Sequence, residues 1–589
     1  MKKLVYLIVL FLVLGLIVSG CNPVVPSVEQ DELGSQTKSR IVTVQLLDST
    51  NKGLAGGVVQ YYSGGWQTFG TTAGVDGKVD KDLPDGTYTF QVSYAGASMQ
   101  KSQNVASDPV VVFQTKLVTM KLLDSAGTTE LSGGAQYYAN GWKTFGNGTT
   151  TTTMELLPLT YTFQVSYAGA SMQKSQNVAS DPVVVFQTKL VTMKLLGSTG
   201  ELAGGAQYYA NGWKTFGNGT TTTTMEMLPL TYTFQVSYAG ASMQKSQNVA
   251  SDPVVIFQAT KVTLQFSGQI QYYAGGWKPF NKPSMNLLPG TYTFKFDAYQ
   301  MNITVSGSEM TKSIVIAKLL NSSGGGISGG AAQYYDGGWK VMGTTGSNGV
   351  LLYAIDGLKG TLSFIMTYGG ASVEKSQNIA TDSYVVFQTT KVTMKLLGSN
   401  NNELNGGAEY YANGYKTFGN GTTTTTMELL PLTYTFRVSY AGASVEKSQN
   451  VASDPVVIFK TTEVTMKLLG SNNNELNGGA EYYANGYKTF GNGTTTTTME
   501  LLPLTYTFRV SYAGASVEKS QNVASNPVVV FQTGKVNSDS GRCTQYYASG
   551  WKTFIQSMEL LPGNYAFLFN DGFPQTAYLI VAGVVNSIH

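Results

Sequence analysis

The segment Thr160–Tyr167 reads TYTFQVSY, and its apolar and polar residues alternate one by one. A period of two is typical of a β-strand that buries one face and exposes the other. The stretch Val118–Leu122 follows the same rule, and Val183–Phe186 adds a short run rich in β-branched residues. No helical periodicity follows Cys21. The sequence therefore predicts an all-β protein.

The alternating strand belongs to a unit that recurs eight times. Every copy contains a Gln/Glu-Tyr-Tyr motif in which the first tyrosine is Tyr61, Tyr137, Tyr208, Tyr272, Tyr334, Tyr410, Tyr482 or Tyr546. Equivalent tyrosines of the first four and last four copies lie 273 or 274 residues apart. The chain thus consists of a block of three long copies and one short copy, present twice.

Each long copy contains seven short segments with strand character. Seven strands in about 70 residues favour a small sandwich of two antiparallel sheets. Eight units could also close into a β-propeller, although one blade usually takes about 40–50 residues. Joints such as Gln114–Leu117 contain almost no linker. Such joints favour stiff head-to-tail stacking into an array on the order of 200 Å long.

Local signals refine this picture. Asp76-Gly77 and Asn348-Gly349 predict hairpin turns, because these pairs tolerate positive φ. Pro158 is expected to begin a strand, and the run Thr149–Thr153 to form an exposed strand. Lys174–Asn177 is expected to be an exposed polar strand.

The expected organisation is a leader, a tether and eight repeats, numbered 1 to 8, of which repeats 4 and 8 are short. The leader is 1–20 and the tether 21–40; the repeats are 41–115, 116–189, 190–260, 261–313, 314–390, 391–462, 463–534 and 535–589.

Repeat 1 carries the segment Asp76–Val79 (DGKV), followed by Leu83–Tyr88 (LPDGTY). This pattern resembles the transthyretin-like repeats of carboxypeptidase-regulatory and Cna B-type modules. The resemblance implies a tandem array of small Ig-like, transthyretin-like β-sandwiches. Most long copies depart from it, with Leu159 where Gly86 would fall. Cna B-type modules often carry a Lys–Asn isopeptide assisted by an acid on a middle strand. The middle strand 161–165 holds no acid, so no isopeptide is expected.

The first 21 residues have the layout of a signal peptide: Lys2 and Lys3, the apolar run Leu4–Val18, and small residues before Cys21. The apolar run is too short for a spanning helix. Val18–Cys21 resembles a bacterial lipobox, in which the cysteine is diacylated and becomes the mature N-terminus. We therefore expect lipidation at Cys21, a flexible tether behind it, and a location in the cell envelope outside the cytoplasm. A plain secretory signal is the alternative.

Composition excludes several classes of function. Only 12% of the residues are charged, and His589 is the single histidine, so a Ser-His-Asp device and a histidine-rich metal site are ruled out. Lys2 and Lys3 of the leader contribute two positive charges to the net charge of +3. The rest of the chain therefore has no excess of positive charge that would favour binding of nucleic acid. No phosphate loop or nucleophile elbow occurs. We therefore expect neither an enzyme nor a cofactor.

Three further features receive structural interpretations. Asp76, Asp80, Asp82 and Asp85 are expected to be a solvated hairpin rather than a calcium loop, because the matching part of repeat 2 has only Glu155. The sequon Asn147–Thr149 is expected to be a turn. Cys543 has no expected disulfide partner and is interpreted as a small, half-buried apolar residue.

The Tyr-Tyr-x-x-Gly-Trp element is the sharpest functional candidate. All six tryptophans lie in it, and Tyr415 and Tyr487 take the tryptophan position in repeats 6 and 7. Adjacent tyrosines of a strand point to opposite faces, so one of each pair is expected to face outward. The candidate ligand-contact residues are Tyr61, Tyr62, Trp66, Tyr137, Tyr138, Trp142, Tyr208, Tyr209, Trp213, Tyr272, Trp277, Tyr334, Trp339, Tyr410, Tyr415, Tyr482, Tyr487, Tyr546 and Trp551.

Two interpretations of these rings remain open. In the first, each Trp and one Tyr fill the end of a small sandwich. In the second, the rings form a platform that stacks on sugars. The sequence thus predicts a lipid-anchored cell-surface repeat protein that acts as a stalk or multivalent adhesive array. Its partners would be a membrane through the lipid and an extracellular glycan or surface protein. A carbohydrate-binding protein is the alternative, and the oligomeric state stays open.

Overall fold

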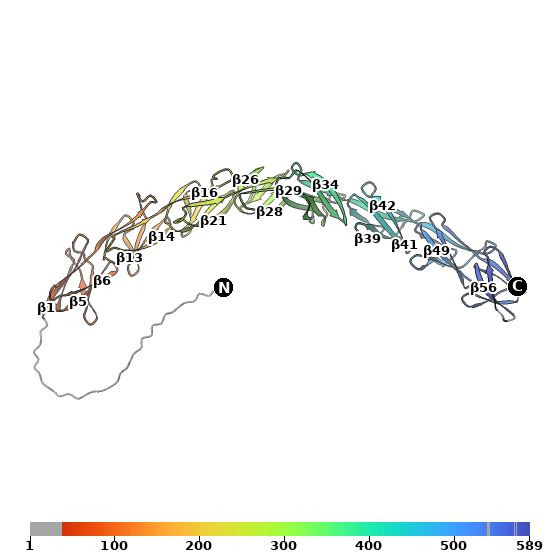
Figure 1. Cartoon of the computed structure of the whole chain (residues 1–589), viewed down its shortest axis with the longest axis horizontal. Helices are drawn as coiled ribbons and strands as arrows, with labels where there is room; N and C mark the ends of the chain where they lie inside the picture. The colour runs from red at the N-terminus through yellow and green to blue at the C-terminus, as the bar shows by residue number, and fades with distance from the viewer. Residues whose placement is uncertain (1–37, 539–541, 571, 573) are drawn as a thin grey trace, which may run out of the picture.

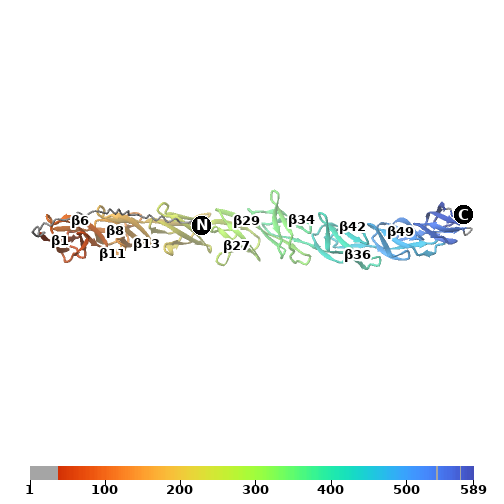
Figure 2. The same cartoon turned by 90° about the horizontal axis from the view of Figure 1, so that it is seen from below.

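The computed structural model describes residues 38–538, 542–570, 572 and 574–589. Within these ranges the chain forms 58 β-strands and no helix, as the all-β prediction requires. The strands make one gently curved row from repeat 1 to repeat 8 (Figures 1 and 2). None of the described residues forms a helix long and apolar enough to cross a membrane. The leader, Cys21 and most of the tether lie outside the described residues.

Repeat 2 represents the long repeats. Its strands are β8 (Lys116–Leu123), β9 (Glu130–Leu131), β10 (Gly134–Tyr138), β11 (Trp142–Thr149), β12 (Thr153–Leu156), β13 (Thr160–Tyr167), β14 (Ala170–Asn177) and β15 (Val183–Gln187). One sheet has the antiparallel order β11-β10-β13-β14, and the other has the order β12-β8-β15, with β15 parallel to β8. The alternating residues Val118, Phe163 and Val165 are fully buried between the sheets. The predicted sandwich is therefore confirmed, although one of its two sheets is mixed rather than antiparallel.

The remaining repeats of the first half have the same strand order. Repeat 1 contains β1 (Ser39–Leu47), β2 (Val58–Tyr62), β3 (Trp66–Thr71), β4 (Lys78–Pro84), β5 (Thr87–Tyr94), β6 (Ala97–Asn104) and β7 (Val110–Gln114). Repeat 3 contains β16 (Lys189–Leu196), β17 (Gly205–Tyr209), β18 (Trp213–Thr220), β19 (Thr224–Met227), β20 (Thr231–Tyr238), β21 (Ala241–Asn248) and β22 (Val254–Gln258). Repeat 4 contains β23 (Thr260–Gln265), β24 (Ile270–Tyr273), β25 (Trp277–Pro279), β26 (Ser284–Leu287), β27 (Gly290–Phe296), β28 (Tyr299–Val305) and the start of β29 (Glu309–Leu320).

The second half repeats the pattern. Repeat 5 contains the rest of β29, β30 (Ala331–Tyr335), β31 (Trp339–Thr344), β32 (Val350–Asp356), β33 (Thr361–Tyr368), β34 (Ala371–Asn378) and β35 (Tyr384–Gln388). Repeat 6 contains β36 (Thr390–Leu397), β37 (Glu403–Leu404), β38 (Gly407–Tyr411), β39 (Tyr415–Thr422), β40 (Thr426–Leu429), β41 (Thr433–Tyr440), β42 (Ala443–Asn450) and β43 (Val456–Lys460). Repeat 7 contains β44 (Thr462–Leu469), β45 (Glu475–Leu476), β46 (Gly479–Tyr483), β47 (Tyr487–Thr494), β48 (Thr498–Leu501), β49 (Thr505–Tyr512), β50 (Ala515–Asn522) and β51 (Val528–Gln532). Repeat 8 contains β52 (Gly534–Ser538), β53 (Cys543–Tyr547), β54 (Trp551–Thr553), β55 (Ser557–Leu560), β56 (Gly563–Phe569), β57 (Pro574–Ile580) and β58 (Val585–Ile588).

Each repeat has its own hydrophobic core, eight in all among the described residues. The short repeats also use seven strands each. The propeller alternative is wrong, because every copy folds its strands into two facing sheets instead of one blade, and the row stays open (Figure 1).

Several local expectations need correction. The run Thr149–Thr153 is not one exposed strand: β11 ends at Thr149, β12 begins at Thr153, and Thr150 between them is buried. The Thr150 hydroxyl donates a hydrogen bond to the Leu131 carbonyl and accepts one from the Gly133 amide. The buried hydroxyl is therefore hydrogen-bonded within the protein. Pro158 lies in a turn before β13 rather than at its start. Asp76-Gly77 is a turn, but the strands it joins, β3 and β4, belong to opposite sheets.

Three of the four clustered aspartates of repeat 1 pair with β1, whereas Asp76 lies 3.8 Å from Lys78. Thr43 donates to Asp80 at 2.6 Å, Ser39 donates to Asp82 at 3.1 Å, and Arg40 forms an ion pair with Asp85. Across the described part of the chain no three His, Cys, Asp or Glu side chains are grouped as metal ligands would be. The sequon is not a turn: Asn147–Thr149 are the last residues of β11, where the Asn147 side chain accepts hydrogen bonds from the Thr149 amide and hydroxyl.

The Lys174–Asn177 segment covers an open edge of the sandwich. It lies in the edge strand β14, where the Lys174 ammonium donates to the Val185 carbonyl at 3.4 Å. The Gln176 amide donates to the Asp181 and Val183 carbonyls at 2.9 and 3.0 Å. These side chains tie one sheet to the edge strand of the other and occupy carbonyls that a foreign strand would need.

Consecutive repeats share their cores. Leu157 of repeat 2 is fully buried in the core cluster of repeat 1, whereas its neighbour Leu156 belongs to the core of repeat 2. The leucines that enter the preceding core in this way are Leu157, Leu228, Leu288, Leu430, Leu502 and Leu561. The joints therefore bury apolar surface, which opposes bending between repeats.

Polar contacts fix the same joints. Glu155 of repeat 2 accepts hydrogen bonds from the backbone and hydroxyl of Ser49 in repeat 1 and from the hydroxyl of the buried linker residue Thr115. Tyr137 donates its hydroxyl to the Ala95 carbonyl of repeat 1 at 2.8 Å. Five further tyrosine hydroxyls donate equivalent hydrogen bonds of 2.7–3.0 Å to backbone carbonyls of the preceding repeat: those of Tyr208, Tyr272, Tyr410, Tyr482 and Tyr546.

The joint between repeats 4 and 5 is a single strand. Residues 309–313 of β29 pair with β23 of repeat 4, and residues 316–320 pair with β35 of repeat 5. Ile314 and Ile316 enter the core of repeat 4, while Val315 and Ala317 on the other face enter that of repeat 5. The two halves of the chain are thus joined through one continuous backbone ladder.

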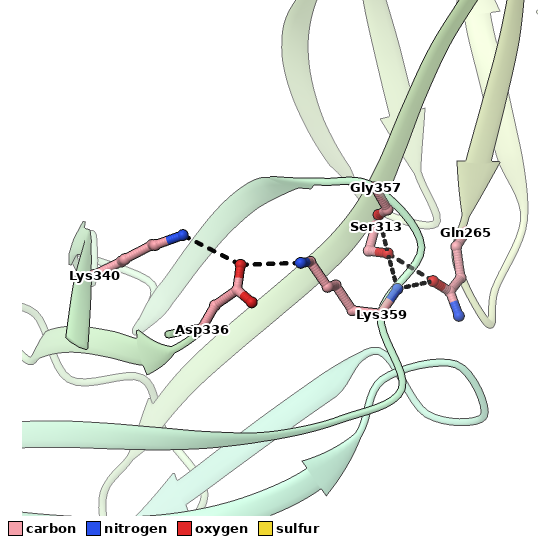
Figure 3. Close-up of polar contacts among 6 residues, drawn as sticks. All are labelled: Gln265, Ser313, Asp336, Lys340, Gly357 and Lys359. Carbon is pink, nitrogen blue, oxygen red and sulfur yellow. Dashed lines mark hydrogen bonds and ion pairs between the residues drawn. The ribbon is translucent and has the colours of Figure 1, made fainter. Parts of the chain in front are cut away.

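A polar network closes this central joint (Figure 3). The buried Ser313 hydroxyl lies 2.6 Å from Gln265 Oε1 and 2.8 Å from the Gly357 carbonyl, and it accepts the Lys359 amide at 2.9 Å. The Lys359 ammonium reaches Asp336 at 2.9 Å, and Asp336 also holds Lys340.

Candidate functional site: exposed aromatic pairs

The first tyrosine of each motif is a core residue. Tyr137 is 1% exposed, and burial raises the pKa of its hydroxyl. Its equivalents in repeats 3 to 8 are equally buried, and Tyr61 is partly buried. These tyrosines belong to the cores and joints and do not form a ligand surface.

The second tyrosine and the tryptophan lie on the surface. In repeat 2, Tyr138 is 50% and Trp142 is 40% exposed. Their ring centroids are 5.5 Å apart at an interplanar angle of 77°. All eight repeats have this pair, at 5.3–5.6 Å and 73–77°. We call it the aromatic pair.

The interpretation of the tryptophans as core plugs was wrong. The hairpin between β10 and β11 turns through Asn140 (φ 53°) and Gly141 (φ 111°) and sets Trp142 directly opposite Tyr138. Both side chains therefore share the outer face of the sheet, because cross-strand partners point the same way.

A row of amides lies beside the aromatic pair in repeats 1 to 3. In repeat 2 the cross-strand neighbours Gln136, Gln164 and Gln173 face outward. Gln173 donates to Gln164 at 2.9 Å, and Gln164 donates to Gln136 at 3.2 Å. The equivalent rows are Gln60, Gln91 and Gln100 in repeat 1, and Gln207, Gln235 and Gln244 in repeat 3.

Repeats 6 and 7 replace this row with charges. In repeat 6 the row is Glu409, Arg437 and Glu446, and Tyr415 stands in the tryptophan position. Arg437 donates to Glu409 at 2.5–2.8 Å, which raises the pKa of the guanidinium. Its guanidinium carbon lies 3.7 Å from the Tyr415 ring centroid. Tyr415 donates its hydroxyl to Glu446, which raises the pKa of the phenol.

The other repeats are mixed. Repeat 4 has Lys295 in the middle of the row, 5.9 Å from the ring of Trp277. Repeat 5 has Ile365 there, beside Gln333 and Glu374.

No protein-family model and no curated protein matches the chain. Among solved structures, a streptococcal ancillary pilin is 12% identical, with 35% of this chain and 98% of that chain covered and a TM-score of 0.14. The major pilin subunit BcpA of Bacillus cereus is 10% identical, with 72% and 99% covered and a TM-score of 0.13. The pilus adhesin SpaC of Lactobacillus rhamnosus GG is 9% identical, with 60% and 55% covered and a TM-score of 0.14. Likeness at this level implies nothing about function, and the sandwich assignment rests on the strand order.

Sequence reasoning missed the amide and charge rows. The signal was available: the outward positions of the middle strand read Gln164 in repeat 2 but Arg437 in repeat 6, and both of their cross-strand neighbours change from Gln to Glu. Only the register shows that these changes occur in one row.

Proposed function

We propose that this protein is a cell-surface stalk that is held to a membrane by lipid on Cys21 and acts as a multivalent adhesive array. The shared joints support this proposal most directly, because a leucine from the following repeat closes the preceding core at six joints, and β29 joins repeats 4 and 5. A stiff array of repeats holds equivalent surfaces at fixed spacing. Weak binding by each repeat therefore gives strong overall binding through high effective concentration.

The anchor is tested by Cys21→Ser. We expect the parent chain to partition into the detergent phase of a cell-envelope extract and the variant to partition into the aqueous phase, because the acyl chains supply the membrane affinity. Cys543→Ser is the control: its thiol is buried in repeat 8, so partitioning should not change. Detergent-phase partitioning of Cys21→Ser would contradict lipidation.

Carbohydrate binding is the second candidate function, and the aromatic pair supports it. An exposed Trp beside an exposed Tyr presents flat apolar faces with polar rims, which suits stacking on a sugar ring. The neighbouring amides supply donors and acceptors for hydroxyl groups. The partner would be an extracellular glycan.

This second function is tested by retention of the full chain on insoluble polysaccharides. We expect Trp142→Ala with Trp213→Ala to lower retention roughly tenfold, because each ring contributes about 0.5–1.5 kcal/mol by stacking. Leu117→Ala with Leu190→Ala is the control: these side chains are also exposed but lie on the opposite sheets of the same repeats. Equal loss in both double variants would contradict a role for the aromatic pair.

A further inference from the structure

The aromatic pair has two contrasting forms, one in repeats 1 to 3 and the other in repeats 6 and 7, whereas repeats 4, 5 and 8 are mixed. In repeats 1 to 3 it adjoins an uncharged amide row, and the tryptophans are 40–41% exposed. In repeats 6 and 7 the equivalent tyrosine is only partly exposed and contacts an arginine and a glutamate. In both repeats the difference involves the three positions of the row and the tryptophan position. It therefore affects the whole outer face of the sheet that carries the aromatic pair.

The uncharged form suits a neutral, hydroxyl-rich ligand. Within the row Gln136 and Gln173 each make one amide hydrogen bond and Gln164 makes two, and all three retain further donor and acceptor capacity. A sugar hydroxyl can both donate and accept, so it complements such a row. The nearby lysines point elsewhere: Lys174 reaches the Val185 carbonyl on the other sheet, and Lys143 packs against Gly96 at the joint. An anionic chain would therefore find no cation in the row.

In the charged form the polar groups and the tyrosine ring are already occupied by contacts with one another. Arg437 lies over the face of Tyr415 at 3.7 Å and is held there by Glu409. Glu446 takes the hydroxyl of the same ring. A sugar that stacked on this ring would have to displace the guanidinium from both the ring and its carboxylate. Repeat 7 has the same contacts through Arg509, Tyr487, Glu481 and Glu518.

We propose that repeats 1 to 3 carry the carbohydrate sites, that their ligand is a neutral polysaccharide chain of pyranose sugars, and that repeats 6 and 7 carry a self-masked form of the same site. This inference rests on the second candidate function. It distinguishes three repeats with open sites from two repeats whose sites are closed by their own side chains.

The test exchanges the two forms in the full chain. The unmasked variant carries Glu409→Gln, Arg437→Gln, Glu446→Gln and Tyr415→Trp, with the four equivalent changes in repeat 7. The masked variant carries Gln136→Glu, Gln164→Arg, Gln173→Glu and Trp142→Tyr, with the equivalent changes in repeats 1 and 3. Both use residue sets that already fold on this backbone. The probes are cellulose, chitin, β-1,3-glucan, mannan and starch, with alginate as the anionic polysaccharide.

Tryptophan fluorescence gives a second readout, because all six tryptophans of the chain belong to aromatic pairs. We expect unmasking to strengthen retention on the neutral polysaccharide that the parent chain binds by about tenfold, since added sites raise avidity. We expect masking to remove most retention, and we expect the two tryptophans that unmasking adds to repeats 6 and 7 to be protected from iodide quenching by that polysaccharide.

The outcomes separate the two proposals. If the parent chain binds none of the neutral polysaccharides, the carbohydrate function fails and the inference fails with it. If the parent binds, but both exchanges leave retention and quenching unchanged, the masking inference alone is wrong. Binding to alginate in preference to the neutral chains would overturn the assigned ligand class.

Discussion

Leu157→Ala should destabilise repeat 1, although Leu157 belongs to repeat 2. The side chain is fully buried in a cluster with Val42, Phe90 and Phe113 of repeat 1. Truncation removes its burial and leaves a cavity at the end of that core. Substitutions of this kind cost about 2–5 kcal/mol. The loss should appear mainly in the repeat that the leucine enters.

Leu156→Ala is the matched control for this substitution. The two leucines are adjacent and equally buried, but Leu156 belongs to the core of repeat 2. Hydrogen exchange of the full chain, read peptide by peptide, distinguishes the repeats, whereas one unfolding temperature for eight linked domains would not. We expect Leu157→Ala to speed exchange in β1 and β7, and Leu156→Ala to speed it in β8 and β13. Faster exchange confined to repeat 2 in both variants would contradict the shared core.

The strands could be predicted from sequence because alternation reports directly on burial. Phe163 and Val165 occupy the inward positions that the period of two assigns to them. The opposite faces of Tyr137 and Tyr138 follow from the same geometry. Repetition of the pattern eight times then made the tandem array visible.

Three features lay beyond this reasoning. Leu157 follows the end of β12, where alternation no longer applies, and its partner core is supplied by another repeat. Trp142 follows a tight hairpin, and the register of that hairpin places it outside. The Arg437 row depends on two cross-strand neighbours, of which Glu409 lies more than 20 residues away in sequence. For Leu157 and the Arg437 row the deciding contact joins separate strands or repeats, whereas for Trp142 it is the register of one tight hairpin.

Gly77→Ala should prevent stable folding of repeat 1. Gly77 has a φ of +64°, and a Cβ there would lie 2.3 Å from the Leu46 carbonyl oxygen and 2.5 Å from the Leu54 amide nitrogen. The Leu46 amide also donates to the Gly77 carbonyl, so the turn sits against β1 and has no room to retreat. We expect a loss of at least ~3 kcal/mol, since backbone must move in addition to the left-handed strain.

Gly64→Ala isolates the conformational part of that cost. Gly64 has a nearly identical φ of +66°, but nothing lies within 4 Å of its ideal Cβ. This variant should lose only about 1–2 kcal/mol, the cost of a left-handed conformation for a residue with a side chain. Limited proteolysis of the full chain with mass mapping should therefore show cuts within repeat 1 in Gly77→Ala and an intact repeat 1 in Gly64→Ala. Equal resistance of the two variants would mean that the turn is free of β1, and that the close approach of Gly77 does not decide the folding of this repeat.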